Sequence, residues 1–358
     1  MYRLYVNSMS PYSSKASAAI GYAGLACKPV TQHLISRYAT LKRLTGKTMV
    51  PVLRRGEWAI NDSTRILTYV AEQTERPMLP SDEALEPLCW LLEEFADEWV
   101  ARWVMWSRWS HTADAEQNAE LIGREMTRGM PLVSSWLGRM AASGIEQRVV
   151  RSGASQINAE ALERSRDRFL QELEHLLEDD PAFLFEAYPT VADFALYGQL
   201  IQYRRDPTGA DNLRMYPNIG RYLDQIEAME LPSPRAPSDV GGSRPVEDVA
   251  PLFAEFLGTY WRLLVENHRA KHGDSPSDDA RVELLDGESF EFRPSRYVVQ
   301  RLVFVLEQLD EAYAAREELF GERGLELEQA LVTQVARLTD DQAGRDLLRD
   351  YPHIGRTS

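Results

Sequence analysis

Residues 48–70 read TMVPVLRRGEWAINDSTRILTYV, and this stretch decides the fold. Apolar residues follow Pro51, a glycine at position 56 marks a turn, and a second short apolar run begins at Trp58. A polar triplet that ends at Ser63 then precedes apolar residues at helical spacing. The stretch therefore predicts a strand, a tight turn, a second strand and the start of a helix.

Pro51 limits how the first of these strands can pair. Proline has no backbone N–H, so it lies at the first residue of a strand or on an edge. An X-Pro bond also becomes cis at a cost of only about 0.5–1 kcal/mol. A cis bond here would turn the N–H and carbonyl of Val50 outward, where an extended peptide could pair with them. Val50 and Pro51 are therefore candidate residues for binding a peptide backbone.

Asp62 and Ser63 stand where the second strand gives way to the helix. The first N–H groups of a helix have no partner inside it and favour an anionic group. Ser63 and these amides suit a carboxylate, and Asp62 suits an ammonium group. The pair is therefore a candidate site for an amino-acid head group, although either residue could simply cap the helix.

Strand and helix patterns also alternate before this stretch. We expect a strand, a helix, a strand and a short helix or turn over residues 2–7, 8–23, 27–35 and 38–44. Together with the hairpin and the helix that follows it, the order is βαβαββα. Helical connections imply parallel pairing and a tight turn implies antiparallel pairing, so the sequence predicts a mixed four-stranded sheet covered by helices.

The chain after position 84 reads as helical, with Gly or Pro between the apolar runs. We expect helices over residues 84–109, 115–139, 158–177, 190–203 and 217–229. The fourth begins with a capping-box pair, in which the Thr190 hydroxyl accepts a helix N–H and Asp193 reaches back to the cap. We therefore assign this pair a structural role.

Two proline-rich stretches, residues 76–81 and 231–246, predict linkers. Past the second one, the pattern predicts a helix over 249–271, a hairpin over 281–292 and two further helices. Asp286-Gly287 is the dipeptide that favours a type I′ hairpin turn.

Composition excludes several classes of partner. The chain has 358 residues, 27% charged and 44% hydrophobic, with a net charge of −15, so we expect no nucleic-acid or membrane partner. Cys27 and Cys89 form no CxxC pair, and neither a signal peptide nor an 18-residue apolar run is evident, which predicts a soluble cytoplasmic protein. His268 and His272 lack an acidic third ligand, so we expect no metal site.

Four sequence stretches resemble motifs of the glutathione transferase superfamily. SPYSSK at 10–15 and VPVL at 50–53, followed by INDSTRIL at 60–67, are similar to its thioredoxin-like domain. PTVADFALYGQL at 189–200 is similar to a buried helix of its all-helical domain. The resemblance covers about residues 1–230.

This resemblance implies a domain organisation. Residues 1–76 would form the thioredoxin-like glutathione-binding domain, and residues 82–230 the all-helical domain. Residues 247–358 would be a mostly helical extension beyond the usual family length, able to cover the pocket, pack on the helical domain or block dimerisation.

The resemblance also implies a chemistry. A free thiol titrates near 8.5, so the enzyme must favour the thiolate, which a hydroxyl donor and the positive end of the first helix can do. Ser10 is the candidate donor, with Ser13 and Tyr12 as alternates, although Ser10 could merely cap the helix. Serine stands where omega-like transferases carry cysteine and tau-like ones serine, so conjugation is expected rather than thiol-transfer redox chemistry.

The remaining binding residues follow from the same resemblance. Pro11, Val50 and Pro51 would contact the cysteinyl unit of glutathione, and Asp62 and Ser63 its γ-glutamyl end. Most of the family has Glu or Gln where Asp62 stands. The glycyl carboxylate would pair with Arg37 or Lys47. The hydrophobic co-substrate would meet the tryptophan-rich helix, with Trp103 and Trp106 as candidate lining residues or, equally, plain core.

Three functions stay open on the sequence. The first is a cytoplasmic, homodimeric glutathione transferase that conjugates glutathione to a hydrophobic electrophile, as in detoxification. The second is a non-catalytic binding or scaffold protein of the same fold. The third is a glutathione-dependent isomerase or dehalogenase.

Overall fold

The computed structural model describes residues 1–128, 131–178, 182–231, 243–273, 276–319 and 325–354. Its first part is built on a mixed four-stranded sheet in the order β2-β1-β3-β4. The strands are β1 (Tyr2–Val6), β2 (Cys27–Thr31), β3 (Val52–Arg55) and β4 (Trp58–Asn61). β1 pairs in parallel with β2, and the other two pairings are antiparallel. The predicted βαβαββα order and mixed sheet are confirmed.

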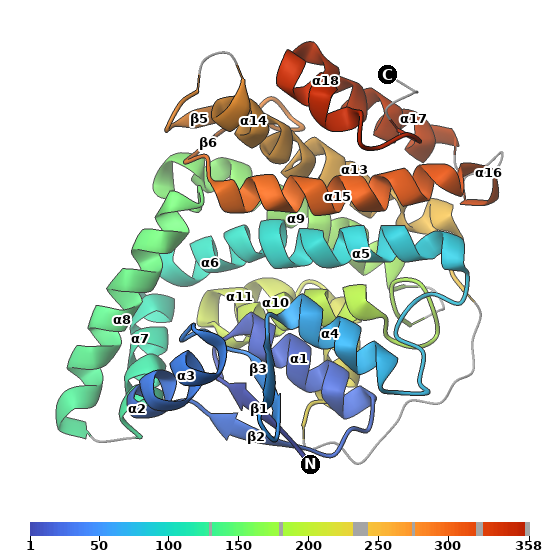
Figure 1. The fold of residues 1–358 in the computed structure, drawn as a ribbon. Coiled ribbons are helices and arrows are strands. Elements are labelled where there is room, and N and C mark those ends of the chain that lie inside the picture. Colours follow the sequence, from blue (N-terminus) through green and yellow to red (C-terminus); the bar gives the residue numbers. More distant parts are fainter. Residues whose placement is uncertain (129–130, 179–181, 232–242, 274–275, 320–324, 355–358) are drawn as a thin grey trace.

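The helices of this part cover the sheet (Figure 1). They are α1 (Pro11–Tyr22), α2 (Leu34–Ser36), a π-helical turn (Arg37–Leu41), α3 (Lys42–Thr45) and α4 (Ser63–Glu72). Every residue of α1 except Tyr12 is buried, because α1 lies between α4 and α10 (Val191–Arg205). The approach to α10 is close: a Cβ atom added at Gly198 would lie 2.5 Å from the Pro11 carbonyl oxygen.

The helical part is organised around one long rod. α5 (Glu86–Phe95), a π-helical turn (Ala96–Val100) and α6 (Ala101–Ser110) run as a continuous element across the molecule (Figure 1). The other helices of this part are α9 (Ala159–Leu176), α10, α11 (Pro207–Leu213) and α12 (Pro217–Glu227). α10 contacts α1, α5 and α6, so the buried helix joins the two parts.

The single helix expected over residues 115–139 is wrong. The chain instead forms an antiparallel pair, α7 (Thr112–Thr127) and α8 (Pro131–Arg151). α7 ends where Arg128 takes a left-handed conformation, at φ 53°, and Pro131 begins α8. The two helices pack backbone to backbone, since a Cβ atom at Gly138 would lie 2.1 Å from the Ala119 carbonyl oxygen.

The residues after position 245 pack on the helical part. They form α13 (Val246–Gly258), α14 (Tyr260–His272), β5 (Ala280–Glu283), β6 (Ser289–Phe292), α15 (Arg296–Ala314), α16 (Arg316–Leu319), α17 (Leu325–Val335) and α18 (Gln342–Leu348). α15 lies along α5, and α13 contacts α9 (Figure 1). We call residues 246–354 the extension.

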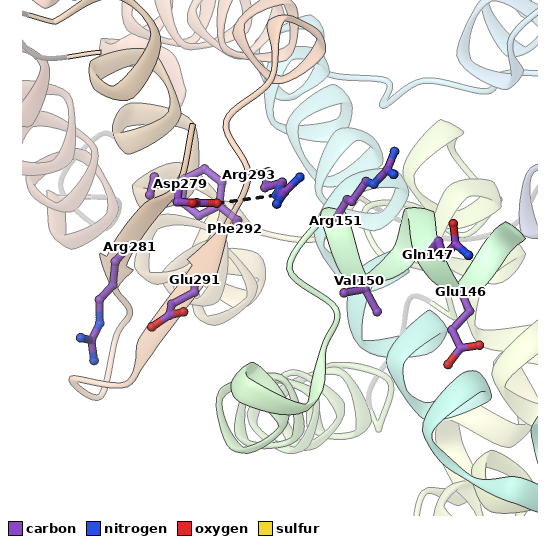
Figure 2. Close-up of a pocket in the computed structure, with 10 residues that line it drawn as sticks. Glu146, Gln147, Val150, Arg151, Asp279, Arg281, Glu291, Phe292 and Arg293 are labelled. Atoms are coloured by element: carbon purple, nitrogen blue, oxygen red, sulfur yellow. Dashed lines mark ion pairs between the residues drawn. The ribbon is translucent and has the colours of Figure 1, made fainter. Parts of the chain in front are cut away.

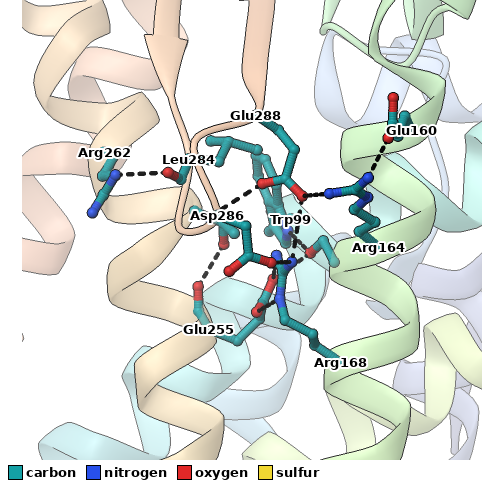
Figure 3. A network of polar contacts seen from close by, with 11 residues as sticks. Trp99, Glu160, Arg164, Arg168, Glu255, Arg262, Leu284, Asp286 and Glu288 are labelled. Carbon is teal, nitrogen blue, oxygen red and sulfur yellow. Dashed lines mark hydrogen bonds and ion pairs between the residues drawn. The ribbon is translucent and has the colours of Figure 1, made fainter.

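An ion-pair network fixes the extension to α9 (Figure 3). Arg168 of α9 binds Glu255 of α13 at 2.8 Å and also pairs with Asp286 in the loop of the β5–β6 hairpin. Glu255 in turn accepts the hydroxyl of Ser165, which accepts the indole N–H of Trp99. The network is half-buried, so breaking one partner would leave charges without compensation.

Two further expectations about the extension are wrong. The helix expected over residues 249–271 breaks at Thr259, where ψ is −79°, and becomes α13 and α14. The hairpin turn is not type I′, because that turn needs positive φ at both central residues and only Gly287 has it. Residues 232–242 of the expected linker lie outside the described residues. No helix among the described residues is long and apolar enough to cross a membrane.

Candidate functional site

Ser10 is the N-cap of α1. Its Oγ accepts the backbone N–H of Ser13 at 3.3 Å, and Pro11 follows at the first helical position. Among the described residues, none accepts the proton of the Ser10 hydroxyl. Capping uses an oxygen lone pair, so the hydroxyl can still donate to a group placed at the mouth of the helix.

The two alternate hydroxyls of the same turn are more enclosed. The Ser13 side chain is buried, and its Oγ accepts the Asn7 N–H at 3.2 Å. The Tyr12 hydroxyl donates to the Asp97 carbonyl at 3.0 Å. Burial, together with the negative charge of Asp97, raises the Tyr12 pKa well above its usual value, so Tyr12 stays protonated. The Tyr12 hydroxyl is already donated and Ser13 is buried, and the donor role of Ser10 stays a prediction.

The bond between Val50 and Pro51 is cis, as expected from the sequence. Pro51 is buried and Val50 is half-buried at the start of β3. The next residue, Val52, pairs with Tyr5 of β1 and Asn61 of β4, which fixes this loop to the centre of the sheet.

Asp62 and Ser63 begin α4. Asp62 is the exposed N-cap, and its Oδ1 accepts the Thr64 N–H at 3.2 Å. Its backbone lies at φ 86° and ψ 126°, a conformation that costs a residue with a side chain about 1–3 kcal/mol. Ser63 is buried, with its Oγ 3.4 Å from Oδ2 of Asp97. Such strain, kept at a helix start, is typical of binding sites.

A buried charge cluster lies beneath both helix starts. The Lys15 ammonium binds Glu93 and, at 2.7 Å, Asp97, and Thr64 donates to Glu93. Burial raises the Asp97 pKa to about 7, although Lys15 opposes this. Burial alone would lower the Lys15 pKa, but Asp97 and Glu93 outweigh it and raise that pKa. The cluster joins α1 and α4 to the long helical rod.

An Asp97→Asn variant is expected to have a flatter dependence of stability on pH. The unfolded carboxyl titrates near 3.9 and the folded one at about 7, so the folded protein holds an extra proton between these values. The free energy of unfolding therefore falls as pH rises from about 4 to about 7. The free energy of unfolding is measured with urea at pH 5, 6 and 7. Its decrease with rising pH should be smaller in Asp97→Asn than in the wild type, by about 1 kcal/mol per pH unit.

The exposed Asp224, changed to Asn, is the matched control and should leave the decline of the wild type unchanged. An equal decline in the wild type and in Asp97→Asn would contradict the raised pKa.

A cavity of about 320 Å³ adjoins Tyr12. Its walls come from the rod on one side, with Asp97, Glu98, Ala101, Arg102 and Met105, and from the end of α8 and the residue after it on the other, with Ile145, Arg148, Val149 and Ser152. We call this space the Tyr12 cavity. Because Asp97 also contacts Ser63, the cavity lies next to the starts of both α1 and α4.

A larger cavity, of about 1090 Å³, lies between the end of α8 and the β5–β6 hairpin (Figure 2). Its lining is charged on both sides, with Glu146 on α8 and the Asp279–Arg293 ion pair, at 3.6 Å, on the hairpin. It contains none of the candidate residues, so its size alone does not make it the site.

Arg37 and Lys47 occupy different environments. Arg37 is half-buried in the π-helical turn after α2, and burial lowers its pKa, although the Glu125 carboxylate opposes this. Lys47 is exposed in the loop before β3. Arg37 is therefore the better enclosed of the two candidate cations.

Two domain models of one superfamily match the sequence. The glutathione S-transferase N-terminal domain matches residues 4–78, and the glutathione S-transferase C-terminal domain matches residues 156–225. These two matched segments belong to the glutathione transferase superfamily. The unmatched residues 79–155 include the long rod and the α7–α8 pair.

Three solved structures that resemble this chain are only 19–20% identical to it. A GST-like protein from Pseudomonas syringae is 19% identical, covering 65% of this chain and 68% of that one, with a TM-score of 0.48. A beta-etherase from Sphingobium sp. is 19% identical, covering 63% and 95%, with a TM-score of 0.45. A glutathione S-transferase from Methylobacterium radiotolerans, in complex with glutathione sulfonate, is 20% identical, covering 67% and 98%, with a TM-score of 0.40. None of the curated proteins matches. The assignment rests on the domain models.

The tryptophans expected at a glutathione transferase co-substrate pocket do not line the Tyr12 cavity. Trp103 is 1% exposed and packs edge-on against Tyr203, with ring centroids 5.4 Å apart. Trp106 is half-buried, with its indole N–H 3.4 Å from Glu163. The rod presents Ala101 and Met105 to the cavity instead.

Sequence reasoning missed three residues at this site: Asp97, Glu98 and Arg148. The two carboxylates precede Trp99 in a helix that is buried on all sides. The spacing of apolar residues therefore does not distinguish side chains that line a cavity from side chains of the core. Arg148 belongs to the helix whose existence was missed. An acidic pair inside an otherwise apolar run was the one signal available.

Proposed function

We propose that this member of the superfamily is a glutathione transferase. The glutathione thiol loses its proton to solvent, and the thiolate sulfur forms a bond to an electrophilic carbon of an apolar compound. The bond from that carbon to its leaving group breaks, and the leaving group departs with the electron pair. The expectation of a homodimer stays a prediction.

The observation that carries this proposal is the convergence of two helix starts on Asp97. Tyr12 of α1 and Ser63 of α4 both contact this residue, through its carbonyl at 3.0 Å and its carboxylate at 3.4 Å. The positive ends of α1 and α4 therefore lie side by side. A thiolate at one and the γ-glutamyl carboxylate at the other would be two of the three anionic groups of ionised glutathione.

Each candidate residue then has a role. The Ser10 hydroxyl donates to the thiolate, and Pro11, Val50 and Pro51 support the cysteinyl backbone. Asp62 takes the ammonium group of the γ-glutamyl unit.

The two carboxylates of glutathione need partners as well. The start of α4, at Ser63, takes the γ-glutamyl carboxylate. Arg37 takes the glycyl carboxylate, with Lys47 as the alternate. The electrophile occupies the Tyr12 cavity, next to the sulfur.

Glutathione is expected to stabilise the wild type against unfolding. At about 100 times its dissociation constant, a ligand that binds only the folded state adds about 2.7 kcal/mol. An Asp62→Asn variant keeps the cap but loses the charge that faces the ammonium group, so it should lose most of this stabilisation. The measurement is the melting temperature with and without glutathione.

Asp82 provides a matched control, because it is also an exposed N-cap aspartate and accepts the Ala84 N–H at 3.0 Å. Asp82→Asn should respond to glutathione as the wild type does. A wild type that glutathione does not stabilise would instead favour a non-catalytic binding protein. The extension, with its own buried contacts to α5 and α9, would then be the functional part.

A further inference from the structure

The charged groups that line the Tyr12 cavity are paired, with one exception. Asp97 pairs with Lys15, as described above. Glu98 accepts the Tyr297 hydroxyl at 2.5 Å and pairs with Arg102, whose guanidinium also donates to the Ser152 carbonyl. These groups therefore have their partners before any ligand binds.

Arg148 is the exception among the described residues that line the cavity. It is exposed on α8, and no described acidic side chain forms an ion pair with it. Its lining neighbours on the same helix, Ile145 and Val149, are apolar, as are Ala101 and Met105 opposite. The cavity therefore combines apolar wall residues, charged groups that are already paired, and one unpaired cation at its rim.

The position of α8 relative to the sheet is fixed by the α7–α8 pair. Glu125 of α7 accepts the Ser8 N–H at 3.1 Å, just before α1, and Arg128 contacts the ring of His33. Because α7 packs along α8, these contacts tie α8 to the start of α1 and keep Arg148 at the rim of the Tyr12 cavity.

We infer that the electrophile of this enzyme carries an anionic end, such as a carboxylate, which Arg148 binds while the apolar body fills the Tyr12 cavity. This rests on the proposed function and names its substrate class. A volume of about 320 Å³ suits a single substituted ring. The α7–α8 pair thereby adds a specificity determinant that the matched domains do not contain.

The experiment compares two aryl chlorides that differ in charge. Initial rates are measured with neutral 1-chloro-2,4-dinitrobenzene and with anionic 4-chloro-3-nitrobenzoate, on the wild type and on Arg148→Gln. The variant should raise the KM for the benzoate by about tenfold to a hundredfold, because it loses a charge-assisted bond. The KM for the neutral chloride should change less than about twofold.

Two variants serve as controls. Arg148→Lys keeps the charge and should recover part of the affinity for the benzoate. Arg151→Gln removes an arginine one turn away that faces the larger cavity, and should change neither KM. Equal effects of Arg148→Gln on both chlorides, or none on either, would overturn the inference while leaving the transferase function intact.

The carboxylate could also come from glutathione. Arg148→Gln could raise the KM for glutathione but not the KM for its glycyl ethyl ester. In that case Arg148 binds the glycyl carboxylate, and the inference about the electrophile is wrong. If the wild type turns over neither chloride, the proposed function fails, and thermal stabilisation by 3-nitrobenzoate then tests Arg148 without turnover. Stabilisation lost in Arg148→Gln supports the anion site, and no stabilisation of the wild type overturns it.

Discussion

An Asp193→Ala variant is expected to lose about 3–5 kcal/mol of unfolding free energy, the largest stability effect of any change considered for this chain. Asp193 is 0% exposed, and its carboxylate accepts four hydrogen bonds. The donors are the N–H and hydroxyl of Thr190, both at 2.7 Å, the Leu184 N–H at 2.9 Å and the Tyr222 hydroxyl at 3.2 Å. Removing the carboxylate leaves two buried backbone N–H groups without acceptors.

Urea unfolding at pH 7.5 measures this effect. Burial raises the Asp193 pKa to about 6, so the carboxylate is ionised at this pH. Asp193→Asn keeps one acceptor oxygen and should lose less than Ala. Asp224→Ala, which removes an exposed aspartate of α12, should change stability by less than about 0.5 kcal/mol. A loss below about 1 kcal/mol for Asp193→Ala would contradict the capping role.

The fold around the sheet could be predicted because its signals are local. Pro51, Gly56 and the polar triplet before α4 each restrict the backbone within a few residues, and the observed strands and helix begin where these residues stand. The capping box was predicted for the same reason, since Thr190 and Asp193 lie within one turn of each other.

The α7–α8 pair could not be predicted from periodicity. Apolar spacing continues through residues 115–139, and the break depends on a left-handed Arg128 and on backbone contact between Gly138 and Ala119. Such contact is a tertiary effect that no local window contains. Pro131 was the local signal, and the helical pattern around it outweighed it.

The charge cluster of the site was beyond sequence reasoning for a different reason. Lys15 meets Asp97 only because α1 and the long rod cross, and nothing in the spacing of the two residues encodes that crossing. The sequence also could not predict whether Trp103 faces the cavity or the core. The rod is covered by α10 on one side and by α15 on another, so apolar residues surround it and do not mark one pocket face.

A Ser10→Gly variant is expected to lose about a hundredfold to a thousandfold in kcat/KM with glutathione and a neutral aryl chloride. Glycine removes the hydroxyl that donates to the thiolate, but it is nearly as good an N-cap as serine, with a stability cost of only a few tenths of a kcal/mol. The variant therefore separates the two roles of Ser10, which Ser10→Ala would mix. Steady-state kinetics and the melting temperature are measured on the same preparation.

The pH dependence of the reaction distinguishes thiolate stabilisation from a change in substrate position. If the Ser10 hydroxyl lowers the pKa of bound glutathione, Ser10→Gly moves the rise of kcat/KM with pH toward the value of the free thiol, near 8.5. Ser8→Gly, two residues earlier and exposed, should leave the profile unchanged. If Ser10→Gly keeps full activity while Ser13→Ala or Tyr12→Phe loses it, the donor is one of those hydroxyls. The more enclosed positions of these two groups make that outcome the less expected one.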